Sequence, residues 1–177
     1  MRENSRQIAI GIAILASGLA ITVIPNAIAQ SPTQAPPTQL LVAQADNSTI
    51  AIEQAIHSRI NQYRSRNGLP PLRLDDRLSQ MARTHSEAMA VGRVGFGHRG
   101  FERRGKAIQK IMGYSNMAEN VAYSGGLKRP DLQAVETWLR SPSHRDNIEG
   151  QYDITGIGVS LSPNGRYYFT QIFVRRN

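Results

Sequence analysis

The sequence predicts an α+β domain in which helices cover both faces of a small antiparallel sheet, a three-layer α-β-α sandwich. Three observations support this prediction. Apolar residues recur at helical spacing on either side of a glycine-rich loop region, a short alternating segment follows that region, and two extended segments joined by a tight turn lie near the end of the chain. Helices that bracket such a sheet form a layered α+β architecture.

The first 29 residues have the pattern of an export signal. Arg2 and Arg6 precede an uncharged apolar run over residues 8–24, and Pro25 ends that run. Ala27-Ile28-Ala29 then supplies the small residues that a signal peptidase recognises. The run falls short of the roughly 20 apolar residues that a membrane-spanning helix needs. We therefore expect cleavage after Ala29 and export of the chain, with an uncleaved N-terminal anchor as the alternative.

Processing of the signal is directly testable. N-terminal sequencing of the exported protein is expected to begin at Gln30, because cleavage after Ala29 leaves that residue first. Recovery of the chain with Met1 intact in the membrane fraction would instead show that the segment is retained as an anchor.

Residues 30–47 are predicted to be a linker. Proline alternates there with glutamine, threonine and alanine, Asp46 is the one charged residue, and these 18 residues include no aromatic residue. Such a composition buries too little apolar surface to offset the entropy lost on ordering. The remaining residues, 48–177, are predicted to be one domain. At about 130 residues it hides roughly two-thirds of its unfolded surface, enough for an independent core.

Cysteine content and charge restrict the possible chemistry. The chain has no cysteine, which excludes thiol nucleophiles and thiolate metal sites. Its formal net charge is +8, and residues 99–110 contain five basic residues and one acidic residue. Such a field favours anionic partners, for example lipid head groups or acidic envelope polymers. A solvated surface without a specific partner is the alternative. Nucleic acid is not expected, because aromatic side chains are not interleaved with the charges.

The first predicted helix covers Ser48 to Asn67. Its apolar residues recur every three or four positions and form one stripe. The stripe consists of Ile52, Ala55, Ile56, Ile60 and Tyr63. Asn67-Gly68 provides a left-handed end, and Pro70-Pro71 prevents continuation. We expect Asn61 and Arg64 on this helix to pin it to a neighbouring loop.

A second helix is predicted to follow Asp75, which would cap it. Its inner face would consist of Leu78, Met81, Ala82, His85 and Met89. We interpret His85 as a hydrogen-bonded core residue, because that is the usual role of a single histidine on an apolar helical face.

Glycine-rich sequence after Gly92 predicts a loop. Four glycines fall within residues 95–105, and regular structure is expected only as a helical turn at Ile108–Met112. His98 lies in this loop, where binding groups concentrate in folded proteins. The alternation over Met117–Tyr123 then predicts a short strand with Glu119 near its start.

Pro130 is predicted to open another helix. Its inner residues would be Leu132, Val135, Trp138 and Leu139. Ser141-Pro142 ends this helix or caps a further turn that carries His144. Two strands follow, Ile154–Leu161 and Arg166–Val174, joined by a tight loop with asparagine and glycine. Gly156 and Gly158 leave one face of the first strand open, as if another element crossed closely there.

These motifs resemble the CAP superfamily, which comprises cysteine-rich secretory, antigen-five and pathogenesis-related-one proteins, and in particular its bacterial secreted, SCP-like branch. Residues 138–148, WLRSPSHRDNI, are similar to the bacterial W-x-x-S-P-x-H-R-x-N-I motif. Glu119-Asn120-Val121-Ala122, residues 156–159 and residues 168–171 support the likeness. The resemblance covers essentially all of residues 52–173 and implies the same three-layer α-β-α sandwich, the CAP fold.

The resemblance also implies a cleft in which two histidines and two glutamates hold a divalent ion. His98, Glu119 and His144 match the first histidine, the first glutamate and the second histidine. Ser141 stands where the second glutamate is expected, and it is interpreted, with Asn120, as a polar neighbour of the cleft. Glu136 lies about 140° around the helix from Ser141 and is expected to pair with Arg140 at helical spacing.

Two imidazoles and one carboxylate suit zinc or a similar divalent ion, and no organic cofactor is expected. Two functions remain open from the sequence. The first is a non-enzymatic binding or signalling module of the envelope or the extracellular space, holding a lipid-like or envelope ligand. The second is a metal-dependent hydrolase with Glu119 as base. The sequence contains neither an H-E-x-x-H pair nor a G-x-S-x-G elbow, so the binding module is favoured. The oligomeric state is left open.

Overall fold

The computed structural model describes residues 37–125 and 128–177, with side chains from residue 48 onward. The signal predicted for residues 1–29 lies outside the described residues. The elements in chain order are α1 (Pro37–Arg66), β1 (Arg73–Leu74), α2 (Asp76–Ala90), α3 (Phe101–Met112), β2 (Asn116–Ser124), α4 (Pro130–Arg140), α5 (Pro142–Glu149), β3 (Ile154–Leu161) and β4 (Tyr167–Arg175).

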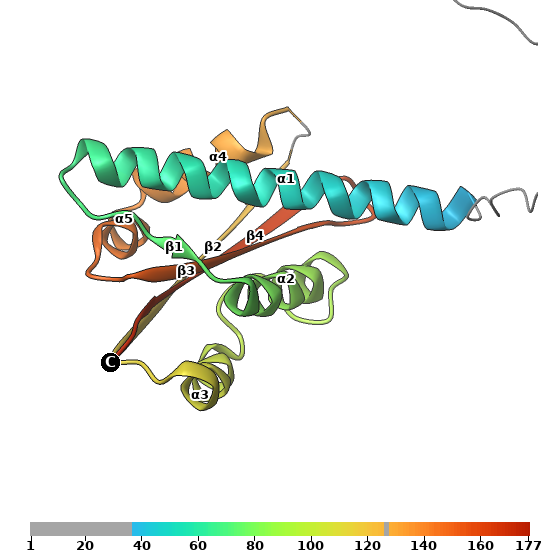
Figure 1. The fold of residues 1–177 in the computed structure, drawn as a ribbon. Helices are drawn as coiled ribbons and strands as arrows, with labels where there is room; N and C mark the ends of the chain where they lie inside the picture. The colour runs from blue at the N-terminus through green and yellow to red at the C-terminus, as the bar shows by residue number, and fades with distance from the viewer. Residues whose placement is uncertain (1–36, 126–127) are drawn as a thin grey trace, which may run out of the picture. The chain divides into compact units, whose positions relative to one another are not determined.

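A four-stranded sheet with the order β1-β3-β4-β2 forms the middle layer. Strand β4 pairs antiparallel with both β2 and β3. Figure 1 shows α1 and α4 on one side of this sheet and α2 and α3 on the other, and α5 packs against α4 and β2. The predicted three-layer α+β sandwich is confirmed. The sequence did not reveal β1, a two-residue strand that runs parallel to β3 and makes the sheet mixed.

Helix α1 begins earlier than predicted. It starts at Pro37 rather than Ser48, so the second part of the predicted linker is helical. Proline is well suited to the first turn of a helix, and the next ten residues contain neither proline nor glycine. The helix ends at Arg66, one residue before the predicted end at Asn67, and Gly68 follows with φ +68°. Within the described ranges, no helix combines the length and apolar character needed to cross a membrane.

Asn61 and Arg64 fix the end of α1 to its surroundings, as the sequence predicted. The amide of Asn61 exchanges two hydrogen bonds with the backbone of Leu72, at 2.8 and 2.9 Å. Arg64 is 1% exposed, and burial lowers the pKa of its guanidinium. The guanidinium donates to the carbonyl oxygens of Pro70, Ile148 and Gly150. Both residues are therefore structural.

Helix α2 lies directly on the sheet. Asp75 caps it by accepting hydrogen bonds from the backbone N–H groups of Arg77 and Leu78, as predicted. The two glycines of β3 allow the close approach. A Cβ on Gly156 would lie 2.2 Å from the carbonyl carbon of Leu78, and one on Gly158 would lie 2.0 Å from a backbone nitrogen of α2. The crossing expected from these glycines is thus present.

Helix α3 corrects the prediction for the glycine-rich region. It spans Phe101–Met112, whereas only a turn at Ile108–Met112 was expected. Gly100, with φ +81°, ends the loop and begins the helix. Gly105 lies inside the helix because space there is limited: a Cβ would stand 2.8 Å from the hydroxyl oxygen of Tyr114. Packing therefore overrides the low helix propensity of glycine.

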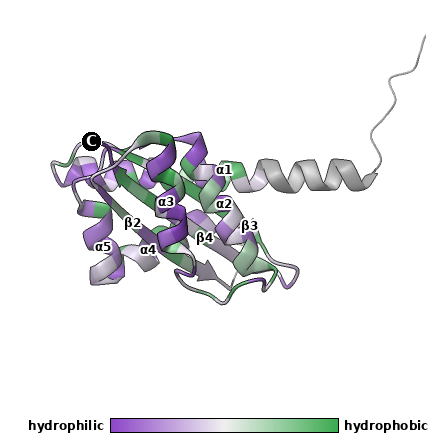
Figure 2. Ribbon diagram, turned by 90° about the horizontal axis from the view of Figure 1, so that it is seen from below, coloured by the Kyte–Doolittle hydropathy of each residue, from purple (hydrophilic) through white to green (hydrophobic). Residues whose placement is uncertain are grey.

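Two apolar clusters fill the spaces on either side of the sheet. The cluster beneath α1, α4 and α5 contains Trp138, which is 0% exposed, and Val135. The second cluster joins Ile108 of α3 to Leu78 of α2 and to the sheet. Figure 2 shows that the helices carry both hydrophobic and hydrophilic stretches, as expected for helices with one face buried. The two apolar clusters hold the sheet between its helical layers, with β2 between α3 and α5. The candidate site lies along β2.

Candidate functional site

Glu119 and His98 meet on the face of β2 that is turned toward α3. The carboxylate of Glu119 is almost completely buried, whereas half of the His98 side chain is exposed. Nδ1–H of His98 donates to Oε1 of Glu119 at 3.0 Å. A neutral imidazole with its proton on Nδ1 keeps the lone pair on Nε2. The carboxylate thus selects a tautomer in which Nε2 of His98 is an acceptor.

Arg104 of α3 completes this group, and the sequence did not single it out. Its Nε donates to Oε2 of Glu119 at 2.8 Å, and its Nη2 donates to Oε1 at 2.7 Å. This is the two-point geometry in which arginine binds carboxylates most strongly. Arg104 belongs to the basic run over residues 99–110, which appeared in the sequence only as surface charge.

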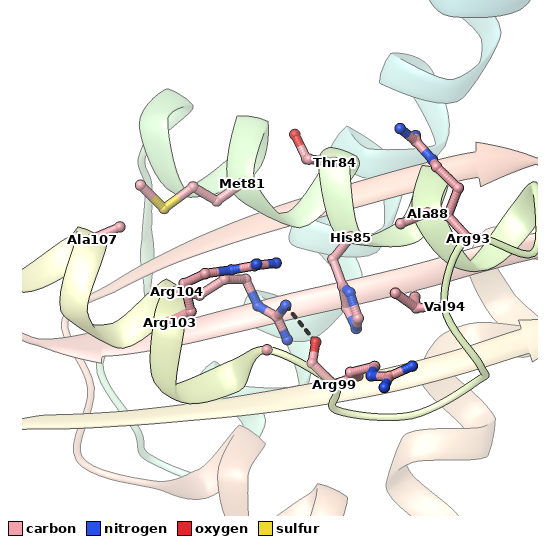
Figure 3. Close-up of a pocket in the computed structure, with 11 residues that line it drawn as sticks. Met81, Thr84, His85, Ala88, Arg93, Val94, Arg99, Arg103, Arg104 and Ala107 are labelled. Carbon is pink, nitrogen blue, oxygen red and sulfur yellow. Dashed lines mark hydrogen bonds between the residues drawn. The ribbon is translucent and has the colours of Figure 1, made fainter.

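The loop that carries His98 is fixed on both sides of the histidine. Nε2–H of His85 donates to the carbonyl oxygen of Gly97 at 2.8 Å, and Nη1 of Arg104 donates to the carbonyl oxygen of Arg99 at 3.0 Å. Figure 3 shows His85 projecting from α2 and Arg104 bonded to Arg99. Burial lowers the pKa of His85, as suits the hydrogen-bonded core histidine predicted from the sequence. His98 is therefore held in place by α2 and α3 together.

A hydrogen bond from Asn120 of β2 to the backbone of His144 joins β2 to α5. The amide of Asn120, 0% exposed, donates to the carbonyl oxygen of His144 at 2.9 Å and accepts from Asn147 at 2.8 Å. Burial, and to a smaller extent the nearby imidazole of His98 when it is protonated, lowers the pKa of His144. Nδ1 of His144 is buried without a hydrogen-bond partner among the described residues. Asn120 thus positions the α5 turn on which His144 lies.

Ser141 and Glu136 have the roles that their positions on α4 suggest. Ser141 ends α4 and begins α5, with Pro142 as the first residue of the second helix. Its hydroxyl lies 3.4 Å from that of Ser143. Glu136 pairs with Arg140 at 3.0 Å on the outer surface of α4, four residues apart, as expected. The Glu136 carboxylate is therefore paired on the surface of α4 and makes no ion pair or hydrogen bond with Glu119 in the described part of the chain.

The sequence profile of the cysteine-rich secretory protein family, CAP, matches residues 57–173. The chain belongs to the CAP family. The match begins within α1 and ends within β4. It therefore includes every residue of the candidate site.

Individual CAP relatives support the assignment. The uncharacterized protein YkwD of Bacillus subtilis is 30% identical over 153 residues, which cover 84% of this chain and 56% of YkwD. The chain therefore spans about half the length of that relative. An extracellular protein of Bacillus anthracis with an SCP domain is 26% identical, with a TM-score of 0.62, over 81% of this chain and 45% of that protein. An outer surface protein of Borrelia burgdorferi, 22% identical, has a TM-score of 0.60 over 73% of this chain and 96% of its own; it shows the fold alone.

The three residues predicted to bind a metal, His98, Glu119 and His144, differ in the contacts that they make. Among the residues that the structure describes, no three histidine, aspartate or glutamate side chains are grouped closely enough to hold a metal ion. Neighbouring residues of a strand face opposite sides of the sheet. The Glu119 side chain bonds to α3, whereas the Asn120 amide bonds to the backbone carbonyl oxygen of His144. Both oxygens of Glu119 also accept from Arg104.

A cavity of about 700 Å³ lies next to this group, between α2 and α3 (Figure 3). Basic side chains line part of it: His85, Arg93, Arg99, Arg103 and Arg104. Apolar side chains line another part: Met81, Ala88, Val94 and Ala107. None of its lining residues, all of which lie in the described part of the chain, is acidic. The cavity thus combines a positive rim with an apolar wall.

Proposed function

We propose that this CAP domain is an exported, non-enzymatic binding module that holds an anionic, lipid-like ligand in the cavity between α2 and α3. The observation that carries the proposal is the lining of the cavity, in which arginine side chains stand beside an apolar wall. A volume of about 700 Å³ falls within the range usual for small-molecule sites. The anionic partner follows from charge complementarity, and the lipid-like tail follows from the apolar wall.

The arginines of the cavity differ in how far they are already engaged. Arg104 binds Glu119, and Arg93 pairs with Glu87 at 2.6 Å on the exposed surface. Arg99 and Arg103 are exposed and form no ion pair with a carboxylate within the described residues. Guanidinium groups bind carboxylates and phosphates through two parallel hydrogen bonds. Arg99 and Arg103 are therefore the residues that we assign to the head group.

Oleate is a suitable probe because it joins a carboxylate to a long apolar chain. Calorimetric titration is expected to show saturable binding of oleate and much weaker binding of oleyl alcohol and acetate, which lack the charge and the chain respectively. Arg99→Gln with Arg103→Gln is expected to weaken oleate binding at least tenfold, because each charge-assisted hydrogen bond contributes roughly 1.5–3 kcal/mol.

A matched control removes the same charge elsewhere. Arg73 and Arg145 are exposed and lie outside the cavity lining, so Arg73→Gln with Arg145→Gln is expected to leave oleate binding unchanged. Equal weakening in both double variants would show that the effect comes from net charge alone, and it would contradict the assignment of Arg99 and Arg103 to the head group. Zinc-dependent turnover of peptide or ester substrates that is lost in His144→Ala would overturn the non-enzymatic proposal in favour of a hydrolase.

A further inference from the structure

We propose that the guanidinium of Arg104 is the fixed cation of this CAP cleft, which neutralises Glu119 and fastens the His98 loop to the sheet without a metal ion. The proposal concerns Glu119 and its partners, and it does not depend on the ligand of the neighbouring cavity. It explains why a carboxylate on a side chain that is only 1% exposed is tolerated on the α3 face of β2.

The charges around Glu119 already balance. Arg104 contributes one positive charge at 2.7 and 2.8 Å, and Nδ1–H of His98 adds a third hydrogen bond at 3.0 Å. An ionised carboxylate offers about four acceptor positions, so three of them are occupied. A divalent ion at the fourth would stand beside the guanidinium, and this repulsion is strong in a buried setting because the surroundings screen it weakly.

Arg104 also makes the mechanical connection that a metal ion would make. Its side chain begins on α3 and bonds to β2 through Glu119 and to the His98 loop through the carbonyl oxygen of Arg99. The Arg104 side chain is only 11% exposed, and that of Glu119 is 1% exposed. Arginine presents its N–H groups in a planar, rigid fork. One residue therefore joins three segments with fixed directions, as a metal with several ligands does.

Zinc titration of the purified chain tests this role, with zinc chloride as the probe. The unmodified chain is expected to show no saturable zinc binding that depends on His98, and zinc or a chelator should leave its thermal midpoint unchanged. Arg104→Gln leaves Glu119 buried without its cation. We expect this variant to melt lower by roughly 10 °C. It is also expected to bind zinc at least tenfold more tightly than the unmodified chain, because a carboxylate beside an imidazole is then available.

Three further variants separate the charge from general damage. Lys106→Gln removes an exposed cation from the same helix, and neither its stability nor its zinc binding should change. Arg104→Lys keeps the positive charge, so it should gain no zinc binding although it loses the two-point geometry. Arg104→Met with Glu119→Gln leaves no unpaired charge; this double variant should fold even if Arg104→Gln does not, and should not gain zinc binding.

Two results would overturn the proposal. One is stoichiometric zinc binding by the unmodified chain that is lost in His98→Ala, because a metal would then share the site with Arg104. The other is a folded Arg104→Gln variant whose stability and zinc affinity equal those of the unmodified chain, because the guanidinium would then have no role as the cation of the cleft.

Discussion

Replacing Trp138 with alanine is expected to lower the free energy of unfolding by roughly 3–5 kcal/mol. Trp138 is the largest fully buried side chain of the described residues. It lies in the cluster between α4 and the sheet, and its loss leaves a cavity that its neighbours fill only in part. Urea titration followed by circular dichroism measures the change.

Two variants act as references for Trp138. Thr137→Ala changes the exposed neighbouring residue of α4 and is expected to stay within about 0.5 kcal/mol of the unmodified chain. Trp138→Phe should cost less than Trp138→Ala, because it keeps much of the ring volume and the indole N–H it removes has no hydrogen-bond partner in the described part of the chain. A thermal midpoint that does not move in Trp138→Ala would contradict the burial of the ring.

The second large effect is expected from Gly158→Ala. A Cβ at this position of β3 would lie 2.0 Å from the backbone nitrogen of Arg83 and 2.2 Å from the carbonyl carbon of Ala82. Both atoms belong to the backbone of α2, so no side-chain rotation relieves the contact. The helix must move off the sheet. We expect a loss of about 3 kcal/mol or more, at the upper end for overpacking, or failure to fold.

Gly95 is the control position for this experiment. It lies in the loop between α2 and α3, a Cβ there would meet nothing within 4 Å, and its φ is outside the left-handed region. Gly95→Ala is therefore expected to change the free energy of unfolding by less than about 0.5 kcal/mol. If Gly158→Ala behaved like Gly95→Ala, α2 would not lie directly on β3. Urea titration of the two variants side by side gives the comparison.

These two positions also show why much of the fold was predictable from the sequence. Trp138 belongs to an apolar stripe, and Gly158 belongs to a strand without side-chain bulk on one face; both patterns arise from local geometry. Two predicted helix boundaries, the start of α1 and the start of α3, were wrong for the same reason. Glycine and proline are local signals, but the extension of α1 to Pro37 and the presence of Gly105 within α3 show that such signals are overridden.

The sequence by itself determined the layered α+β fold, the inward faces of its helices and the approximate location of His98 and Glu119. Only the tertiary structure decided what Glu119 binds. Arg104 lies 15 residues away and was one cation among several in a basic run. Whether it reaches a carboxylate depends on how α3 is placed against β2, and that placement follows from packing around Ile108. Charge patterns report which ions a chain carries, whereas distances of less than 3 Å between them are set by packing.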